Sequence, residues 1–323
     1  MKLLAKATDP LRYIFWKTQV GILHACPPLL GLFNEYGQGS ATSPGVWLRS
    51  FLKFSVRVPR AVCLHVRNIQ EKRIELPLIG VGTTTRCTLC CDKCIGHIPD
   101  LSCQRDTPAD VLIDDLRRLF DCVHNVYSMY LTGGEPLLNP ELGEIVRFCG
   151  SLEKLGEINV FTNGTVFPDA DLLAALREAK AVVRISRYPS ALQPEVETLK
   201  ALLDAHGVAY IHAGGQYWRD TGALGQPAAG AVKRRFNTCL QRLCLPFLNG
   251  KLFVCSEAAM LETEGLLAGG GEDYIDLRVT GPEAFAGQWR ALQKKRLSSG
   301  CAYCMGNTYN SPGVPVAVQR EGG

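Results

Sequence analysis

Residues 78–94 read LIGVGTTTRCTLCCDKC, an apolar run followed at once by a loop with four cysteines. The run Leu78–Val81 has the composition of a buried strand. Thiolates hold iron–sulfur clusters and structural zinc, so this loop is a candidate metal site. Its cysteines fit two spacings. One is Cys87-x3-Cys91-x2-Cys94, and the other is a pair of consecutive C-x2-C knuckles that could hold zinc.

Strands and helices alternate in the sequence after this loop. Thr107-Pro108 and Asn139-Pro140 have the composition of helix starts, with a proline at the first helical position. Further strands are predicted at about 126–132, 158–161, 181–186 and 208–212, and further helices at about 169–180 and 194–206. This order predicts parallel βαβ units. The expected fold class is α/β, a partial (β/α)6 barrel with its site at the carboxyl ends of the strands.

Short polar motifs stand where these strands end. Gly133-Gly134-Glu135-Pro136 follows the second strand and Thr162-Asn163-Gly164 follows the third. On the fourth strand, Arg184 and Ser186 alternate with apolar residues and should face the barrel interior. Together with the C-x3-C-x2-C triad, these motifs resemble the radical S-adenosylmethionine (SAM) superfamily over about residues 77–213. The context therefore favours the triad over the zinc knuckles.

The resemblance implies roles for these residues. Cys87, Cys91 and Cys94 would hold a [4Fe–4S] cluster with one open iron, which the amino and carboxylate groups of SAM would fill. Gly133, Gly134, Glu135, Asn163, Arg184 and Ser186 would bind SAM. In the family, an aromatic residue before the third cysteine lies against the adenine. Here that residue is Lys93, so either a neighbour such as Ile95 takes its role or the adenine packs differently. Cys90 is expected to be a free thiol.

Five further cysteines lie beyond the predicted barrel, at positions 239, 244, 255, 301 and 304. Asn249-Gly250 predicts a hairpin turn just before Cys255. The pattern resembles the twitch form of the SPASM extension, which binds one auxiliary [4Fe–4S] cluster; structural zinc is the alternative. An auxiliary cluster of this kind needs four protein ligands. The spacing favours Cys239, Cys255, Cys301 and Cys304, but Cys244 could replace Cys239. The spare thiol would be either silent or a hydrogen donor.

Charge and composition suggest three regions. Residues 1–75, with eleven basic and four acidic residues, are predicted to be a basic, mainly helical extension with helices at about 10–25 and 45–58. Residues 76–235 would be the radical SAM core and 236–323 the auxiliary domain. The net charge of +4 does not indicate a nucleic-acid partner. No spanning segment or signal peptide is predicted, so the expected location is cytoplasmic. The basic extension suggests weak contact with an anionic membrane surface.

The sequence thus predicts a radical SAM enzyme of the oxidoreductase or epimerase type. Its substrate would be a small polar natural product such as a sugar or an aminocyclitol, and its electron donor a flavodoxin or a ferredoxin. Modification of a ribosomally synthesised peptide is the alternative. A non-catalytic iron–sulfur electron carrier is a remote third reading, which the Gly133-Gly134-Glu135 motif disfavours.

Overall fold

The computed structural model describes residues 66–215, 217–228, 230, 232–267, 272–308 and 311–320. The helices predicted at about 10–25 and 45–58 lie outside these residues. No helix in the described ranges is long and apolar enough to cross a membrane.

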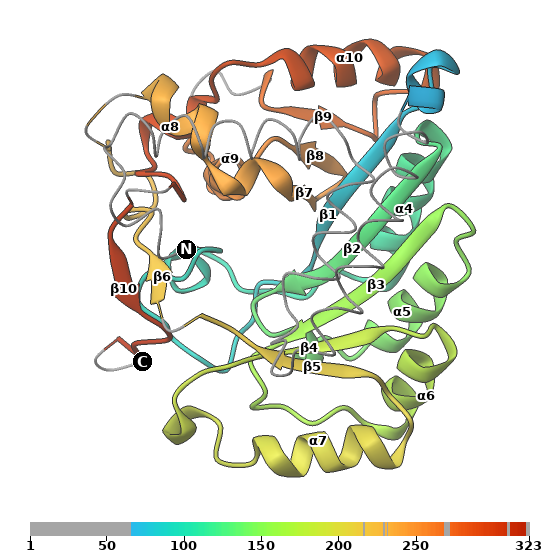
Figure 1. Cartoon of the computed structure of the whole chain (residues 1–323), viewed down its shortest axis with the longest axis vertical. Coiled ribbons are helices and arrows are strands. Elements are labelled where there is room, and N and C mark those ends of the chain that lie inside the picture. Colours follow the sequence, from blue (N-terminus) through green and yellow to red (C-terminus); the bar gives the residue numbers. More distant parts are fainter. Residues whose placement is uncertain are drawn as a thin grey trace, which may run out of the picture.

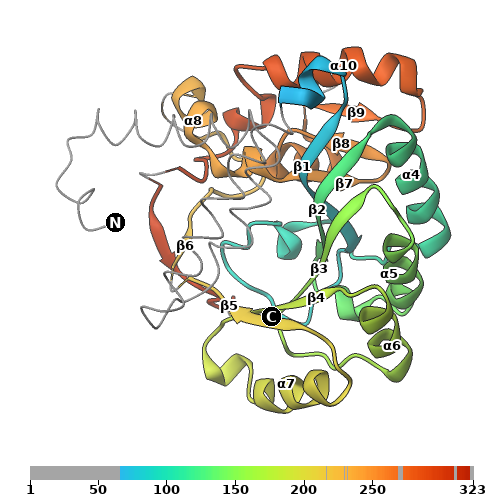
Figure 2. The same cartoon turned by 45° about the vertical axis from the view of Figure 1, so that its right-hand side comes forward.

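An eight-stranded sheet in the order β5-β4-β3-β2-β1-β7-β8-β9 forms the centre of the described chain. The strands are β1 (Glu75–Thr84), β2 (Asn125–Gly133), β3 (Leu155–Thr162), β4 (Val182–Ser186), β5 (Tyr210–Ala213), β7 (Leu245–Leu248), β8 (Lys251–Phe253) and β9 (Tyr274–Asp276). The first six strands in that order run parallel to one another, whereas β8 is antiparallel to β7, and β9 is antiparallel to β8. Figures 1 and 2 show the sheet curving as an open barrel, which confirms the predicted α/β partial barrel.

Four helices cover the convex side of the sheet (Figure 1). They are α4 (Ala109–Cys122), α5 (Leu142–Gly150), α6 (Ala170–Glu178) and α7 (Val196–Ala205). Asp169 caps α6, because its carboxylate accepts a bond from the Leu172 N–H. The sequence predicts the N-cap of α4 at Thr107, but the structure places it one residue later, at Pro108. Helix α4 begins at Ala109, whose N–H donates to the Glu141 carboxylate at 2.8 Å, so a neighbouring helix supplies the acceptor.

The sixth parallel strand does not follow β5, as a sequential barrel would require. It is β7, which pairs with β1 in the register Ile79↔Leu245. Seven of the first eight residues of β1 are buried because a strand lies on each side of it and helices cover one face. The hairpin predicted at Asn249-Gly250 is confirmed, with φ angles of 52° and 74° at the two turn residues. Its strands belong to the main sheet, so residues 245–276 continue the sheet of the core.

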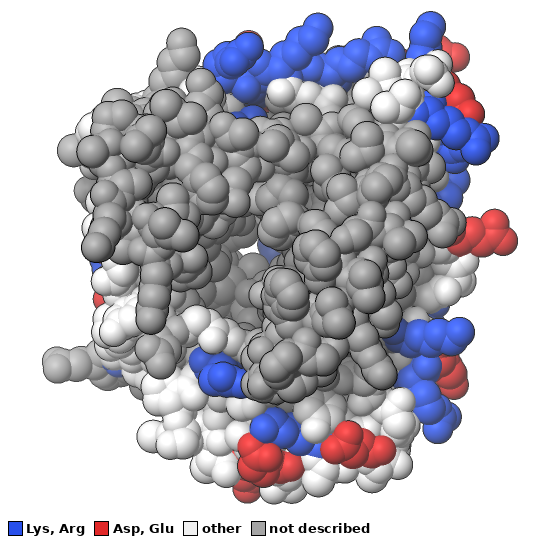
Figure 3. Space-filling view, viewed as in Figure 1, with Lys and Arg blue, Asp and Glu red and all other residues white. Residues whose placement is uncertain are grey.

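Of the remaining elements, helix α10 (Pro282–Lys294) packs against α4 and β9 and so continues the helix layer on the convex side. The others are β6 (Tyr217–Arg219), β10 (Gly313–Pro315), α8 (Val232–Thr238), α9 (Ser256–Thr263) and the short 3₁₀ helices η2 (Ile98–Asp100), η3 (Pro136–Leu138), η4 (Ser190–Leu192), η5 (Leu240–Leu243) and η7 (Ser299–Ala302). Strands β6 and β10 form a separate antiparallel ribbon. Figure 3 shows Lys and Arg side chains gathered along the upper rim, over α10, where Arg290 and Lys294 are exposed.

Alternation along the strands separates two kinds of side chain. Met129 and Leu131 of β2 belong to the core under the helices. Tyr130, between them, points to the concave side, where its ring contacts Phe161 of β3 with centroids 4.8 Å apart. The concave side of β1 carries no side chain at Gly80 and Gly82. This leaves room there for side chains from β7 and the residue before it.

Candidate functional site

The loop after β1 presents three free thiols that share one environment. Cys87, Cys91 and Cys94 form no disulfide. Burial raises the pKa of all three thiols, and at Cys91 the charges of Cys94 and Cys87 add to burial in raising it to about 11. The three sulfur atoms therefore lie near enough to interact electrostatically.

Each of the three sulfur atoms accepts N–H bonds. The Leu89 N–H and the Asn163 amide donate to Cys87 at 3.5 and 3.7 Å. The Gln319 amide donates to Cys91 at 3.2 Å, and the backbone N–H groups of Gly96 and Ile98 donate to Cys94. These N–H bonds stabilise negative charge on sulfur and so lower the pKa of each thiol, although the rise caused by burial is larger. The thiolate is the form that binds iron. The donor set of this loop fits an iron–sulfur cluster.

The glycines of the second strand-end motif are needed for contact with the cysteine loop itself. A Cβ at Gly133 would lie 2.0 Å from the Thr84 carbonyl oxygen, and one at Gly134 would lie 2.0 Å from that of Arg86. The N–H groups of Gly134 and Glu135 donate to these two carbonyls at 2.9 and 2.8 Å. The two glycines therefore allow the second strand end to lie against the backbone of the cysteine loop, and their contact with SAM stays a prediction.

Glu135 joins the second strand end to the third. Its side chain is fully buried, and its carboxylate accepts the backbone N–H of Asn163 at 2.7 Å and that of Leu137 at 3.1 Å. Burial raises the pKa of Glu135 to about 7, although these N–H bonds lower it. In this structure Glu135 holds the loops together, and a contact with SAM stays a prediction.

Asn163 and Gln193 complete this framework. The Asn163 amide also donates to the Thr88 hydroxyl at 2.9 Å, which ties the third strand end to the cysteine loop. The buried Gln193 amide donates to the carbonyl oxygens of Asn163 and Ser186 and so joins the third strand end to the fourth. Sequence reasoning missed Gln193, because it lies in an ordinary loop and no local pattern marks it.

Arg184 lies on the concave side of the sheet, as predicted, and Ser186 lies at the end of its strand. The Arg184 guanidinium donates to the Asn159 side chain and lies 5.8 Å from the centre of the Tyr130 ring. Val183 and Ile185, in contrast, belong to the core. The buried cation and amide give this part of the concave side a polar character.

Tyr188 is a second residue that the sequence analysis missed. Burial raises the pKa of its hydroxyl, and the charges of Cys91, Cys94 and Cys87 raise it further, so the ring lies near all three thiols. Its ring meets that of Trp218 edge-on at 5.8 Å. Tyr188 therefore stands beside the first cysteine loop, with Trp218 packed against it, although Lys93 occupies the position that is usually aromatic.

Lys93, Ile95 and Cys90 make contacts outside the group of three thiols, and so does His212, which lies in β5. Lys93 pairs with Asp220 at 3.5 Å, and Ile95 lines a pocket formed by the later cysteines. The Cys90 backbone bonds to the C-terminal segment. His212 pairs with Ile185 across the sheet and therefore faces the helices; the charges of Lys200 and Glu197 of α7 act on its pKa, which burial lowers.

Comparison with known proteins agrees with this geometry. Residues 81–222 match the model of the Radical SAM superfamily. The chain contains a radical SAM domain. It is 30% identical over 127 residues to a GTP 3',8-cyclase of Microcystis aeruginosa, which covers 38% of this chain and 36% of that protein. It is 36% identical over 105 residues to molybdenum cofactor biosynthesis protein 1 of Bos taurus, 31% of this chain and 16% of that one.

The chain therefore spans about a third of the length of the cyclases that it matches. A solved structure, titled BtrN in complex with AdoMet and 2-DOIA, superposes with a TM-score of 0.48 at 14% identity and covers 71% of this chain and 93% of that one. The radical SAM domain ends before the second group of cysteines.

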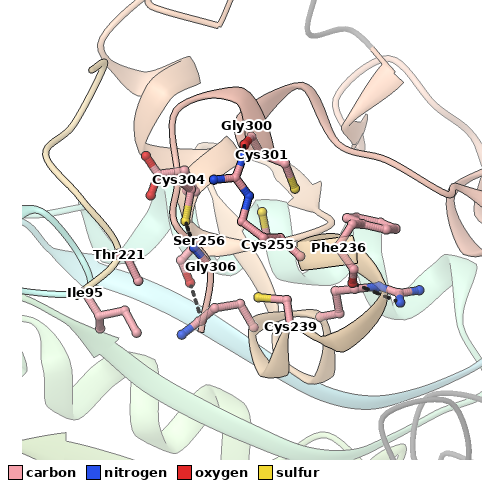
Figure 4. Close-up of a pocket in the computed structure, with 14 residues that line it drawn as sticks. Ile95, Thr221, Phe236, Cys239, Cys255, Ser256, Gly300, Cys301, Cys304 and Gly306 are labelled. Atoms are coloured by element: carbon pink, nitrogen blue, oxygen red, sulfur yellow. Dashed lines mark hydrogen bonds between the residues drawn. The ribbon is translucent and has the colours of Figure 1, made fainter. Parts of the chain in front are cut away.

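Beyond the radical SAM domain, four free cysteines surround one pocket. Figure 4 shows the sulfur atoms of Cys239, Cys255, Cys301 and Cys304 around it. Cys239 precedes η5, Cys255 caps α9 and Cys301 lies in η7, so three short elements bring them together. Burial raises the pKa of all four thiols, and each accepts a backbone N–H bond, such as the one from Gly306 to Cys304 at 3.2 Å.

Cys244 is placed differently from these four. It precedes β7, and its sulfur lies 3.1 Å from where a Cβ at Gly80 would be, on the concave side of β1. Its charge raises the pKa of Tyr130, whereas burial alone raises the pKa of Cys244 itself, to about 12. The structure thus separates Cys244 from the pocket that Cys239 lines.

A buried pair links the two cysteine groups. His97, three residues after Cys94, contacts Glu257, two residues after Cys255, with Nε2 and Oε2 3.1 Å apart. Both side chains are almost fully buried, and Glu257 lines the second pocket.

Among the described residues, no three His, Cys, Asp or Glu side chains lie close enough to share one metal ion.

Proposed function

We propose that this chain is a radical SAM enzyme with two [4Fe–4S] clusters that acts on a C–H bond of a small polar molecule. Cys87, Cys91 and Cys94 would hold the cluster that binds SAM, and the four cysteines of the second pocket would hold the other. One observation carries the proposal: seven free thiols form two groups, and every one of them accepts N–H bonds.

When bound and reduced, the first cluster would supply the electron for reductive cleavage of SAM, which would provide the radical chemistry for removal of a hydrogen atom from the substrate. The protein's own part is to orient SAM and to exclude water. The framework of Glu135, Asn163 and Gln193 fixes the strand ends relative to the cysteine loop. Tyr188 and Trp218 offer an aromatic surface that suits the adenine.

The concave side of the sheet supports a polar substrate. Arg184, Asn159 and Ser128 are all at most 4% exposed, and the Asn159 amide donates to the Ser128 hydroxyl. The Arg184 guanidinium bonds to Asn159 and lies 3.9 Å from the Glu157 carboxylate, so this lining carries paired charges and amide and hydroxyl groups. These groups fit a sugar or an aminocyclitol better than an apolar molecule.

The outcome of the reaction depends on what happens to the substrate radical. Loss of one further electron to the second cluster, together with release of a proton, would give oxidation. Return of a hydrogen atom to the opposite face would give epimerisation, for which a protonated thiol is suited; the thiyl radical left on the sulfur would then take up one electron from the second cluster and one proton. Cys244 stays protonated at neutral pH, because burial raises its pKa to about 12, and it lies on the concave side. Epimerisation would use Cys244 as the donor.

The names of the relatives give a second candidate, the cyclisation of a nucleotide such as GTP. The match lies within the part of the chain that would bind SAM, so it bears on the shared chemistry more than on the substrate. Modification of a ribosomally made peptide is the alternative from the sequence. Incubation with GTP, with sugars and with a candidate precursor peptide would distinguish these substrates.

The proposed function is tested by anaerobic reconstitution with iron and sulfide. Two clusters require about eight irons per chain, and the triple Cys87→Ala, Cys91→Ala, Cys94→Ala variant should keep about four and produce no 5′-deoxyadenosine. Cys122→Ala is the matched control, because Cys122 is a buried thiol outside both groups. SAM cleavage by the triple variant would refute the proposal. A wild-type protein that binds iron but never cleaves SAM would be an electron carrier.

A further inference from the structure

The C-terminal end of the described chain returns to the first cysteine loop. After β10, the Val318 carbonyl accepts the Asp92 N–H at 2.7 Å, and the Arg320 N–H donates to the Cys90 carbonyl at 2.9 Å. The Arg320 guanidinium also pairs with Asp100 at 2.9 Å. Three residues near the end of the chain thus form a bridge over the middle of the Cys87–Cys94 loop.

Gln319 lies at the centre of this bridge. Its side-chain oxygen accepts the Cys90 N–H at 2.9 Å, and its side-chain nitrogen donates to the Ala317 carbonyl at 2.7 Å and to the Cys91 sulfur at 3.2 Å. Because a backbone N–H must meet an oxygen and a carbonyl must meet an N–H, these two bonds fix the orientation of the amide. The N–H group is therefore held against the sulfur.

The turn before Gln319 is strained in a way that serves this placement. Ala317 has a φ of 52°, a left-handed conformation that an alanine rarely adopts, and it is 2% exposed. The bonds of Asp92, Cys90 and Asp100 on its C-terminal side hold the chain in this conformation.

We propose that Gln319 is a positioning residue for the first cluster, whose N–H bond to Cys91 sets the reduction potential of that cluster. This rests on the proposed function, since Cys91 must be a cluster ligand. Reduction adds one negative charge, shared between iron and sulfur, and an N–H donor stabilises the reduced form more than the oxidised one. The tail that follows the second cysteine group therefore helps to control electron entry at the first.

The test compares Gln319→Leu and Gln319→Glu with the wild type in full-length, reconstituted protein. Leucine removes the donor. Glutamate keeps an acceptor for the Cys90 N–H but directs a carboxylate oxygen at the sulfur. Gln288→Leu is the control, because this glutamine lies in α10 and bonds to Thr280. The midpoint potential is measured by EPR-monitored redox titration, and the signal that changes on addition of SAM identifies the first cluster.

We expect both Gln319 variants to keep about eight irons and to have a more negative midpoint potential. In the glutamate variant the reduced-to-oxidised ratio at a fixed potential should fall about tenfold, which is about 59 mV for a one-electron couple. Gln288→Leu should leave the midpoint potential of the first cluster unchanged. Unchanged potentials in both Gln319 variants would overturn the inference, and so would loss of only the first cluster in the leucine variant, since Gln319 would then serve assembly. A wild-type protein without a SAM-responsive signal would instead refute the proposed function.

Discussion

Replacing Gly134 with alanine tests whether the strand-end glycine holds the first cysteine loop in place. The new Cβ would lie 2.0 Å from the Arg86 carbonyl oxygen, 2.7 Å from its carbonyl carbon and 3.2 Å from the Cys87 Cβ. In folded proteins a Cβ atom essentially never comes closer than 3.0 Å to a heavy atom outside its own residue and the two adjacent residues. The chain at Arg86 and Cys87 must therefore move by about 1 Å or more, and it carries the first ligand with it.

The magnitude follows from the contacts that this movement breaks. The Gly134 and Glu135 N–H groups would lose their bonds to Thr84 and Arg86, at about 1 kcal/mol each. The overpacking itself costs about 1–3 kcal/mol. We expect the apoprotein to lose about 3–5 kcal/mol of unfolding free energy, or the loop to detach locally. Either outcome should lower the iron content by about four per chain and abolish 5′-deoxyadenosine formation.

Urea unfolding of the apoprotein and iron analysis after anaerobic reconstitution measure these effects. Gly287→Ala is the control, because this glycine lies exposed in α10 and a Cβ there meets nothing within 4 Å. That variant should gain about 0.4–1 kcal/mol and keep both clusters. A Gly134→Ala protein with wild-type stability, full iron content and full SAM cleavage would show that the contact with Arg86 does not hold the first cysteine loop in place.

Three further predictions follow from buried groups. The pKa of Glu135 is raised to about 7 in the folded state, so the folded protein favours the protonated carboxyl group. As the pH rises from 4.5 to 7, the wild-type apoprotein should therefore lose up to about 3 kcal/mol of unfolding free energy relative to Glu135→Gln. A difference in urea unfolding that does not change with pH would contradict this. Arg278 donates to both oxygens of the buried Asp115 at 2.8 and 2.6 Å, so Arg278→Ala should cost about 2–3 kcal/mol in the same assay, unlike an exposed Arg118→Ala. Cys255→Ala should lower the iron content by about four per chain, whereas Cys244→Ala should not. Equal iron loss in both variants would overturn the assignment of ligands. If the reaction is an epimerisation, Cys244→Ala should keep SAM cleavage and lose the epimerised product.

The sequence by itself determined the local and sequential features of this protein. Alternating apolar and helical patterns gave the strands and helices of the radical SAM domain, because each depends on the periodicity of neighbouring residues. The C-x3-C-x2-C spacing and the strand-end motifs located the first cysteine loop. The Asn249-Gly250 turn was also predictable, since only a few residue types accept two consecutive positive φ angles.

Only the tertiary structure decided which distant segments meet. The pairing of β7 with β1, the concave placement of Cys244 and the return of Gln319 to Cys91 all join residues separated by more than a hundred positions, and no local pattern encodes such a contact. The glycines of the second strand end were found from the sequence, but their reason was not. They are required by the backbone of Thr84 and Arg86, which the parallel pairing of β1 with β2 brings against them.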